Sequence, residues 1–503
     1  MSVIIRKLNE SFVQIKNYDQ ELYKKLRERF TFYSPNYRFN PKYKAGYWDG
    51  KISLFDSQND TIPIGLFPDL YKIVKTKTND IICDFSLFEK GYDISKEEIL
   101  NFCKAINLPF KPYEHQINAI QKAIQKKRII LESATSSGKS FIQFVICNFL
   151  KLKNDKEKIL IIVPTVQLVE QMAKDFCDYA KNFCDYSENI KKIYSGQGKE
   201  INKQAFIVIS TYQSLSNIKN NKVFEAFTSV ICDEAHTATS LSISNIVSKC
   251  TNAEFKIGCT GSLSNEKVHE MQLKGLFGSV EKIISARQLI EKDMAANFDI
   301  KGIILEYNID DRIILKNKLE GIKTKKRKEI ARYTCEMELI RGKENRLNFF
   351  VDFANKIDKN SIFLFKNIEY GRKLFRELRL NTKKRVYYID GSIDVLKREE
   401  IRANLERYNN CILVTSFGTF STGINVKNIY NAVLVESMKS PIKIIQTIGR
   451  ILRKLPNKNA VLFDIADELS LNRFTNYSMR HFKSRLSTYK KERHEVKVIK
   501  IKI

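Results

Sequence analysis

The sequence predicts an α/β protein with two parallel-sheet domains in tandem, a small α+β accessory domain before them and a basic extension after them. Short β-branched apolar runs alternate with helix-prone segments, and this alternation occurs twice along the chain. The 503 residues are too many for a single hydrophobic core. We therefore expect domains over residues 1–105, 106–290, 291–467 and 468–503.

The accessory domain is rich in aromatic and basic side chains, which interleave between residues 33 and 48. Aromatic rings among basic residues suit base stacking and phosphate contact. A domain of this size also needs a core, and we expect Phe39 and Trp48 to fill it.

The first alternation contains five short runs that are apolar on both faces, which is typical of strands in a parallel sheet covered by helices. We expect these strands at Arg128–Leu131, Ile159–Val163, Phe206–Ile209, Val230–Cys232 and Lys256–Cys259. Helical segments fit between them, for example Phe141–Leu152 and Gln167–Cys177.

The second alternation has the same character. Its expected strands are Gly302–Leu305, Ser361–Phe365, Val386–Ile389, Ile412–Val414, Ala432–Val435 and Val461–Phe463. A charged, helix-prone insertion at residues 311–346 interrupts it. At the end of the basic extension, apolar and Lys residues alternate from Val496 to Ile503, a pattern that suits an edge strand.

The net charge of +29 indicates a polyanionic partner, because each phosphate that Lys or Arg neutralises releases a condensed counterion. AT-biased coding would explain the excess of Lys over Arg, but not the shortage of acidic residues. The sequence has no CxxC pair, no signal peptide and no apolar run long enough to cross a bilayer. We expect a cytoplasmic protein with a polyanionic partner.

A phosphate-binding loop is predicted at Ala134-Thr135-Ser136-Ser137-Gly138-Lys139-Ser140, after the strand that ends at Leu131. Gly138 would let backbone N–H groups approach phosphate, Lys139 would contact the β and γ phosphates of ATP, and Ser140 would bind Mg²⁺. Ser133 stands where the general pattern has glycine. The alternative is an ordinary junction between a loop and a helix.

Two carboxylates follow another buried strand. Asp233 and Glu234 come directly after Ser229-Val230-Ile231-Cys232, at the edge of the sheet where ligands bind. Asp233 would hold Mg²⁺ and Glu234 would polarise the attacking water. The alternative, a solvated acidic turn, is weaker beside the loop just described.

Further motifs appear in order. They are Gln116, Pro164-Thr165-Val166-Gln167-Leu168, Ser210-Thr211-Tyr212-Gln213-Ser214, Thr260-Gly261-Ser262, Thr415 to Asn425, and Gln446 to Arg453. With these motifs the chain resembles superfamily two helicases of the DEAH-box-like kind, which have two RecA-like domains. The resemblance implies that Gln116 reads the adenine edge and that Gly423 also contacts ATP. His115 stands where such enzymes commonly have Tyr.

The last of these motifs carries Gln446, Arg450 and Arg453, whose spacing places them on one face of a helix. The resemblance implies that this face points into the cleft between the domains and that the two arginines reach the γ-phosphate when the cleft closes. A solvated basic helix face is the alternative.

DNA contacts are implied in the same way, at positions that match the usual contact residues of the motifs. They are Thr165, Thr211, Gly391, Ser392, Thr415 and Thr422. Translocation cannot depend on base identity, so hydroxyl and N–H groups would hold the phosphate backbone. Ser and Thr at strand ends also serve as helix caps, and that reading stays open.

The segments Tyr37–Tyr43 and Gly46–Ile52 resemble the accessory domain of the UvsW-type recombination helicases of T-even-type phages. This resemblance implies ATP-driven remodelling of forks, D-loops and Holliday junctions, with 3′-to-5′ polarity. The motor motifs are also compatible with the translocating subunit of a restriction system or with an RNA helicase. An annealing or scaffold protein with a spent ATPase is a further alternative, which the intact Lys139, Asp233 and Glu234 disfavour.

Overall fold

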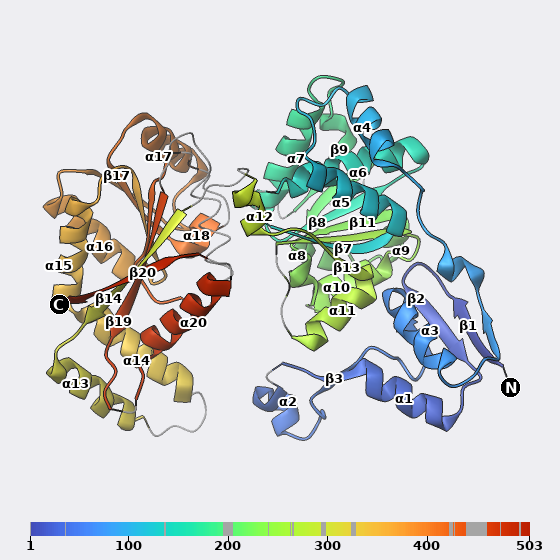
Figure 1. The fold of residues 1–503 in the computed structure, drawn as a ribbon, viewed down its shortest axis with the longest axis horizontal. Coiled ribbons are helices and arrows are strands. Elements are labelled where there is room, and N and C mark those ends of the chain that lie inside the picture. The colour runs from blue at the N-terminus through green and yellow to red at the C-terminus, as the bar shows by residue number, and fades with distance from the viewer. Residues whose placement is uncertain are drawn as a thin grey trace. The chain divides into compact units, whose positions relative to one another are not determined.

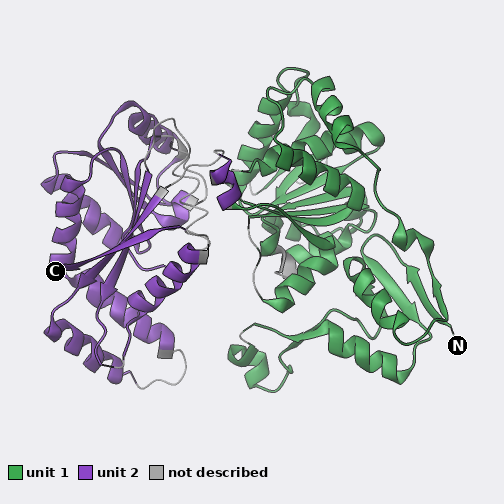
Figure 2. Cartoon of the chain, viewed as in Figure 1, with its two compact units in different colours: residues 1–285 green, residues 286–503 purple. Residues whose placement is uncertain are grey.

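The computed structural model divides the chain into two compact units, Met1–Ser285 and Ala286–Ile503 (Figure 2). The residues that the structure describes are 2–35, 37–134, 137–194, 205–239, 241–261, 263, 266–292, 298–322, 328–421, 426, 428–438, 460–472, 474–491 and 494–503.

The first unit contains a seven-stranded sheet in which every neighbouring pair is parallel (Figure 1). Its order is β13-β7-β12-β11-β8-β10-β9. The strands are β7 (Arg128–Ser133), β8 (Ile159–Val163), β9 (Ile190–Ile193), β10 (Ile207–Thr211), β11 (Ser229–Asp233), β12 (Phe255–Thr260) and β13 (Ser279–Ile284). All five predicted strands are confirmed. Strands β9 and β13 form the two edges of the sheet and were not predicted.

Helices cover both faces of this sheet because alternate strand residues point to opposite sides. Ile159, Ile161 and Val163 belong to the core cluster under α5 (Glu114–Lys126), α6 (Lys139–Lys153) and α7 (Val166–Ala180). Leu160 and Ile162 belong to the cluster on the other face. The helices there are α8 (Tyr212–Ser216), α9 (Lys222–Glu225), α10 (Leu241–Lys249) and α11 (Lys267–Phe277).

The N-terminal part of the first unit is α+β, as predicted. A mixed four-stranded sheet has the order β5-β2-β1-β6, in which β1 pairs antiparallel with β2 and parallel with β6. The elements are β1 (Val3–Lys7), β2 (Phe12–Lys16), α1 (Gln20–Phe30), β3 (Thr31–Tyr33), α2 (Pro41–Lys44), β4 (Lys51–Ser53), β5 (Thr61–Pro63), α3 (Phe67–Lys75), β6 (Ile81–Cys83) and α4 (Lys96–Ala105).

The expectation that Phe39 and Trp48 fill the core of this part is wrong. Phe39 is 74% exposed, and Trp48 is half-buried and lies outside the hydrophobic cluster of the sheet. The core consists instead of aliphatic and aromatic side chains from the strands, α1 and α3, such as Ile15, Leu26 and Phe30. Apolar residues of these elements recur at strand and helix spacing, whereas the aromatic residues around Phe39 do not.

The second unit also contains a seven-stranded, all-parallel sheet, with the order β16-β17-β15-β18-β19-β14-β20. The strands are β14 (Phe298–Glu306), β15 (Ser361–Phe365), β16 (Arg385–Ile389), β17 (Cys411–Ser416), β18 (Asn431–Leu434), β19 (Ala460–Glu468) and β20 (Val496–Lys502). The six predicted strands are confirmed. The basic tail ends in β20, the edge strand that its alternating pattern predicts.

Helices of the second unit include α12 (Ala286–Glu291), α13 (Ile309–Glu320), α14 (Lys328–Gly342), α15 (Glu344–Lys356), α16 (Ile368–Asn381), α17 (Val395–Arg407), α18 (Phe417–Ser421) and α20 (Tyr477–Lys491). The charged insertion contributes α13 and α14, which agrees with its helix-prone sequence. Among the helices in the described ranges, none is long and apolar enough to cross a membrane.

Candidate nucleotide site

The predicted phosphate loop leads from β7 into the first turn of α6. Gly138 is the N-cap residue of α6 and has a φ of 83°, in the left-handed region that favours glycine. A Cβ at this position would collide with the side-chain amide of Gln116. The positive φ is the main reason that the loop needs glycine here, and a side chain would also force Gln116 to move. Thr135 and Ser136, which were also predicted to contact ATP, lie outside the described residues.

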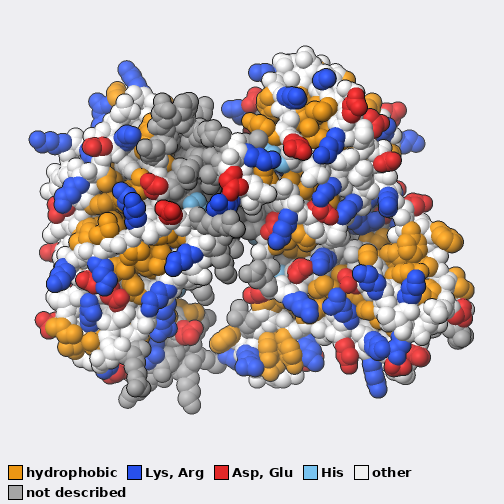
Figure 3. All heavy atoms as spheres, in the orientation of Figure 1, with side chains coloured by type: hydrophobic (Ala, Val, Ile, Leu, Met, Phe, Trp, Pro, Cys, Tyr) orange, Lys and Arg blue, Asp and Glu red, His pale blue; other side chains and the backbone are white. Residues whose placement is uncertain are grey.

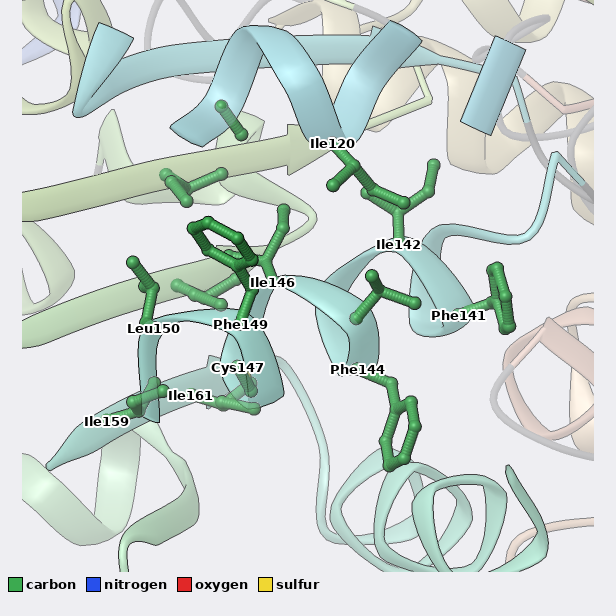
Figure 4. Close-up of a cluster of buried hydrophobic side chains, with 14 of the residues drawn as sticks. Ile120, Phe141, Ile142, Phe144, Ile146, Cys147, Phe149, Leu150, Ile159 and Ile161 are labelled. Carbon is green, nitrogen blue, oxygen red and sulfur yellow. The ribbon is translucent and has the colours of Figure 1, made fainter. Parts of the chain in front are cut away.

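Helix α6 begins here because its apolar side chains anchor it against the sheet. Phe141, Ile142 and Ile146 are buried, and Figure 4 shows Ile142 directed toward Ile120 of α5. Lys139 and Ser140 occupy the first turn, where four backbone N–H groups have no partner within the helix. The positive end of the helix dipole lies at the same place, so the turn favours an anion.

The two carboxylates lie at the end of the neighbouring part of the sheet. Asp233 is the last residue of β11, and its Oδ1 accepts a hydrogen bond from Gln143 Nε2 at 3.2 Å. Lys139 Nζ lies 3.9 Å from Glu234 Oε1 and donates to the carbonyl of Ser133 at 3.4 Å. The structure thus brings Lys139, Asp233 and Glu234 together, although Asp233 comes 94 positions after Lys139 in the sequence.

The backbone of Glu234 is unusual. Its φ is 50°, which is uncommon for a residue with a side chain and often marks a functional site. The carboxylate lies 3.3 Å from His236 Nδ1, and the same ring nitrogen lies 3.0 Å from Thr260 Oγ1. Thr260 ends β12, so the predicted motif Thr260-Gly261-Ser262 is linked through this histidine to the acidic pair.

Gln116 joins the loop to α5. Its Oε1 accepts from the Tyr113 N–H at 2.9 Å, and its Nε2 donates to the Ser137 carbonyl at 3.0 Å. His115, which replaces the usual Tyr, is buried with its Nε2 2.9 Å from the same carbonyl. Its ring stacks on the half-exposed ring of Tyr113, with the centroids 5.8 Å apart. Tyr113, two residues earlier, therefore presents the open aromatic face at this position.

Three residues of this site were not selected from the sequence. Gln143 follows Lys139 by one helical turn, so the spacing alone could have indicated it. Tyr179 lies on α7, and its hydroxyl is 2.9 Å from Ser140 Oγ. Ser133, noted only as a departure from the glycine pattern, donates through its hydroxyl to Ser137 Oγ at 2.7 Å. A hydroxyl in place of glycine therefore ties the loop to itself.

The predicted DNA contacts that the structure describes lie at strand ends. Thr165 follows β8, and Thr211 ends the adjacent strand β10. Each caps the next helix: Thr165 accepts a hydrogen bond from the Leu168 N–H at 3.3 Å, and Thr211 accepts one from the Ser214 N–H at 3.4 Å. In the second unit, Gly391 and Ser392 follow β16, while Thr415 lies buried in β17. The capping role is thus present for the first pair.

Five further predicted site residues lie outside the described part of the chain. They are Thr422, Gly423, Gln446, Arg450 and Arg453.

Comparison with protein families identifies the class of this protein. Residues 109–265 match the family described as "Type III restriction enzyme, res subunit", and residues 334–454 match "Helicase conserved C-terminal domain". These two matches fall on the two parallel-sheet units in the order of a two-domain motor. Together with the loop and the acidic pair, they define a nucleotide-hydrolysing helicase.

The N-terminal part gives the narrower assignment. Residues 3–84 match the family "DNA helicase UvsW, N-terminal". The chain is 33% identical over 500 residues to the ATP-dependent DNA helicase uvsW of Enterobacteria phage T4, covering 94% of this chain and 95% of that one. The chain belongs to the UvsW family of ATP-dependent DNA helicases.

The chain is also similar to a solved structure and to a second relative. The crystal structure of T4 UvsW matches this fold with a TM-score of 0.50 and 31% identity, covering 100% of both chains. The "DNA 3'-5' translocase XPB2" of Sulfurisphaera tokodaii is 22% identical over 377 residues, which cover 70% of this chain and 80% of that protein.

Proposed function

We propose that this helicase uses Mg²⁺ and ATP to move 3′ to 5′ along DNA and to remodel branched DNA such as forks, D-loops and Holliday junctions. The observation that carries the nucleotide part is the approach of Lys139 Nζ to Glu234 beside the N-terminus of α6. Family membership and the net charge of +29 support the DNA part. The name of the XPB2 relative supports the direction.

The donor set around the loop fits a triphosphate with its metal ion. Ser140 offers a hydroxyl and Asp233 a carboxylate, and hard oxygen ligands of this kind suit Mg²⁺. The ion would neutralise charge on the β and γ phosphates. Lys139 would then leave Glu234 for the phosphates, and Glu234 would be free to orient and polarise the attacking water. His236 contacts both Glu234 and Thr260, so a movement of Glu234 would be transmitted to Thr260 through this ring.

The remaining roles follow the motifs. Gln446, Arg450 and Arg453 would complete the transition state, and Gly423 would contact the nucleotide. Thr165 and Thr211 would present hydroxyl or N–H groups to the DNA backbone, as would Gly391, Ser392, Thr415 and Thr422. We expect the protein to act in the cytoplasm of the host cell, where phage recombination and replication proteins are candidate partners.

The ATPase rate with different nucleic acids tests this proposal. We expect single-stranded DNA and a four-way junction each to stimulate hydrolysis well above the rate without nucleic acid. Stimulation by RNA alone would contradict the DNA assignment and favour an RNA helicase. A rate of ATP hydrolysis that no nucleic acid changes would contradict the proposal that this protein is a translocase.

The direction needs its own experiment. We expect a duplex with a 3′ single-stranded overhang to be unwound faster than the same duplex with a 5′ overhang, because the motor would load on the strand along which it moves 3′ to 5′. A preference for the 5′ overhang would reject the proposed polarity and leave the ATPase assignment intact.

A further inference from the structure

The segment between β3 and β4, residues 31–53, forms a small aromatic lobe in the first unit. Figure 1 shows it at the end of α1, away from the four-stranded sheet. Only Phe32 of its aromatic side chains packs on the hydrophobic cluster of that sheet. The other six lie outside it: Tyr33, Tyr37, Phe39, Tyr43, Tyr47 and Trp48. Among them Phe39 is 74% exposed and Tyr47 is 87% exposed.

Some of these rings hold the lobe together. Tyr33 and Tyr37 stack with their centroids 4.6 Å apart, and Tyr43 meets Tyr37 edge-on at 4.8 Å. Gly50, with a φ of 81°, lets the Tyr37 ring close against the backbone, because a Cβ there would collide with it. Aromatic pairs of this kind replace a core in a segment too small to have one.

Phe39 and Tyr47 do not share this structural role. Within the described residues, neither ring packs against another aromatic ring. Exposing two large rings within one short segment is unfavourable in water and often marks a binding surface. The packing of the lobe therefore does not explain why these two rings are aromatic and exposed.

The charges around the rings indicate what would bind there. The lobe carries Arg38, Lys42, Lys44 and Lys51 against a single acid, Asp49. Lys44 Nζ lies 5.9 Å from the Phe39 centroid, and Lys51 Nζ lies 5.3 Å from that of Tyr33. Figure 3 shows apolar side chains flanked by basic ones in the region where Figure 1 places α2.

The basic character continues at the base of the lobe. An open hollow beside Thr31 and Phe32 is lined by Lys25, Arg29 and Lys267, together with Glu28. Exposed π faces next to Lys and Arg suit a polyanion that itself carries flat rings. A membrane surface would offer the anions but no rings to stack on.

We propose that the aromatic lobe binds unpaired bases of a DNA strand, with Phe39 and Tyr47 stacking on bases and Arg38, Lys42 and Lys44 contacting phosphates. This proposal rests on the proposed function as a DNA-remodelling motor. Stacking tolerates every base because each has a π face, so the lobe holds single strands at a branch without reading their sequence.

Trp48 supplies a direct probe because it is the only tryptophan of the chain and lies in the lobe. The full chain without nucleotide is titrated with a short oligothymidylate while Trp48 emission is recorded. We expect a saturable change of emission. In the double variant Phe39→Ala/Tyr47→Ala, we expect the affinity to fall on the order of 10- to 100-fold.

Phe85→Ala is the matched control. Phe85 is an equally exposed aromatic residue of the same unit at 88%, but it lies beside Asp84 and outside the lobe. We expect its affinity for the oligonucleotide to equal that of the unsubstituted protein. The pair Phe39→Leu/Tyr47→Leu keeps apolar bulk and removes the π faces, so it should lose affinity as the alanine pair does.

Three results would overturn the proposal: an unchanged affinity of both double variants, an equal loss in Phe85→Ala, or Trp48 emission that ignores DNA. Tighter binding of a matched RNA than of DNA would also overturn it. Emission of each variant without DNA must match that of the unsubstituted protein, which shows that the lobe is folded. Failure of the proposed function would be seen in a different measurement. In that case DNA would not stimulate ATP hydrolysis even in the unsubstituted protein.

Discussion

Lys256 gives a prediction whose size can be worked out from the structure. It lies in β12 with 1% of its surface exposed, and its Nζ donates to Ser11 Oγ at 2.6 Å and to the Val247 carbonyl at 3.2 Å. Ser11 precedes β2, so this lysine joins the N-terminal part to the parallel sheet. Burial lowers the pKa of Lys256 from 10.5 to about 7, and the nearby Arg128 acts in the same direction.

The sign of the pH effect follows from this shift. Between the folded pKa of about 7 and the unfolded value of 10.5, the unfolded chain binds one more proton at this residue than the folded chain. The free energy of unfolding therefore rises with pH in this window, by about 1.4 kcal/mol per pH unit. From about pH 7.5 to about pH 9.5, Lys256 alone contributes about 2 to 3 kcal/mol.

Lys256→Met removes this contribution. Methionine has a similar length, so the change leaves little cavity, and it forfeits two hydrogen bonds worth about 1 kcal/mol each. The variant should thus be at least as stable as the unsubstituted protein near neutral pH, where charging the buried amine costs about 5 kcal/mol. As the pH rises, the variant should become less stable than the unsubstituted protein.

The assay is urea unfolding followed by Trp48 fluorescence at a series of pH values. Between about pH 7.5 and about pH 9.5, the free energy of unfolding of the unsubstituted protein should rise more steeply with pH than that of Lys256→Met. The difference in slope should correspond to about one bound proton. Lys222→Met, at an exposed lysine of α9, should leave the slope unchanged. Equal slopes in all three proteins would refute the reasoning, because Lys256 would then titrate alike in both states.

Three further predictions concern the motor and the second unit. Lys139→Ala should abolish ATP turnover and leave DNA binding largely intact, since the phosphate site and the DNA contacts use different residues; a binding assay that shows DNA affinity lost as well would contradict this division. Arg453→Ala should lower kcat by a factor on the order of 10³ or more, as for other arginine fingers, whereas unchanged steady-state hydrolysis would exclude it from the transition state. Arg485→Met should destabilise the second unit by about 3 to 5 kcal/mol, because it leaves Asp464 buried without the cation that donates to both its oxygens at 2.7 and 2.8 Å. A melting temperature within a degree or so of the unsubstituted value would argue against it.

The parallel sheets, and the grouping of the candidate nucleotide-site residues at one edge, were predictable because their signals are local. Runs such as Ile159–Val163 are apolar at every position, and this favours a buried parallel strand over any alternative. Gly138-Lys139-Ser140 and Asp233-Glu234 each follow such a run, so strand order alone brings them to one edge.

Long-range polar contacts were not predictable. Glu336, in the charged insertion, is fully buried and accepts hydrogen bonds from Tyr477 and Ser478 N–H at the start of α20, at 2.7 and 2.8 Å. The sequence shows only a charged helix there, and nothing in its spacing points to a partner more than a hundred residues away. The insertion therefore has a structural function that its composition conceals.

The segment after β18 also makes long-range polar contacts that the sequence does not predict. Arg346 donates to the Val435 carbonyl at 2.6 Å, Arg341 pairs with Glu436 at 2.8 Å, and Arg485 donates to the Met438 carbonyl at 2.7 Å. Side chains from three helices thus fix the residues that precede the predicted arginine motif. Two of these acceptors are backbone carbonyls, which every sequence has, so no pattern could have identified them.

Strand displacement on matched substrates tests the central claim most directly. A fork, a Holliday junction and a linear duplex of the same sequence are incubated with Mg²⁺ and ATP, beside the Lys139→Ala variant. The account predicts that the unsubstituted protein resolves the fork and the junction far faster than the linear duplex, and that the variant resolves none of them. Equal displacement by the variant, or no displacement of any branched substrate, would contradict it.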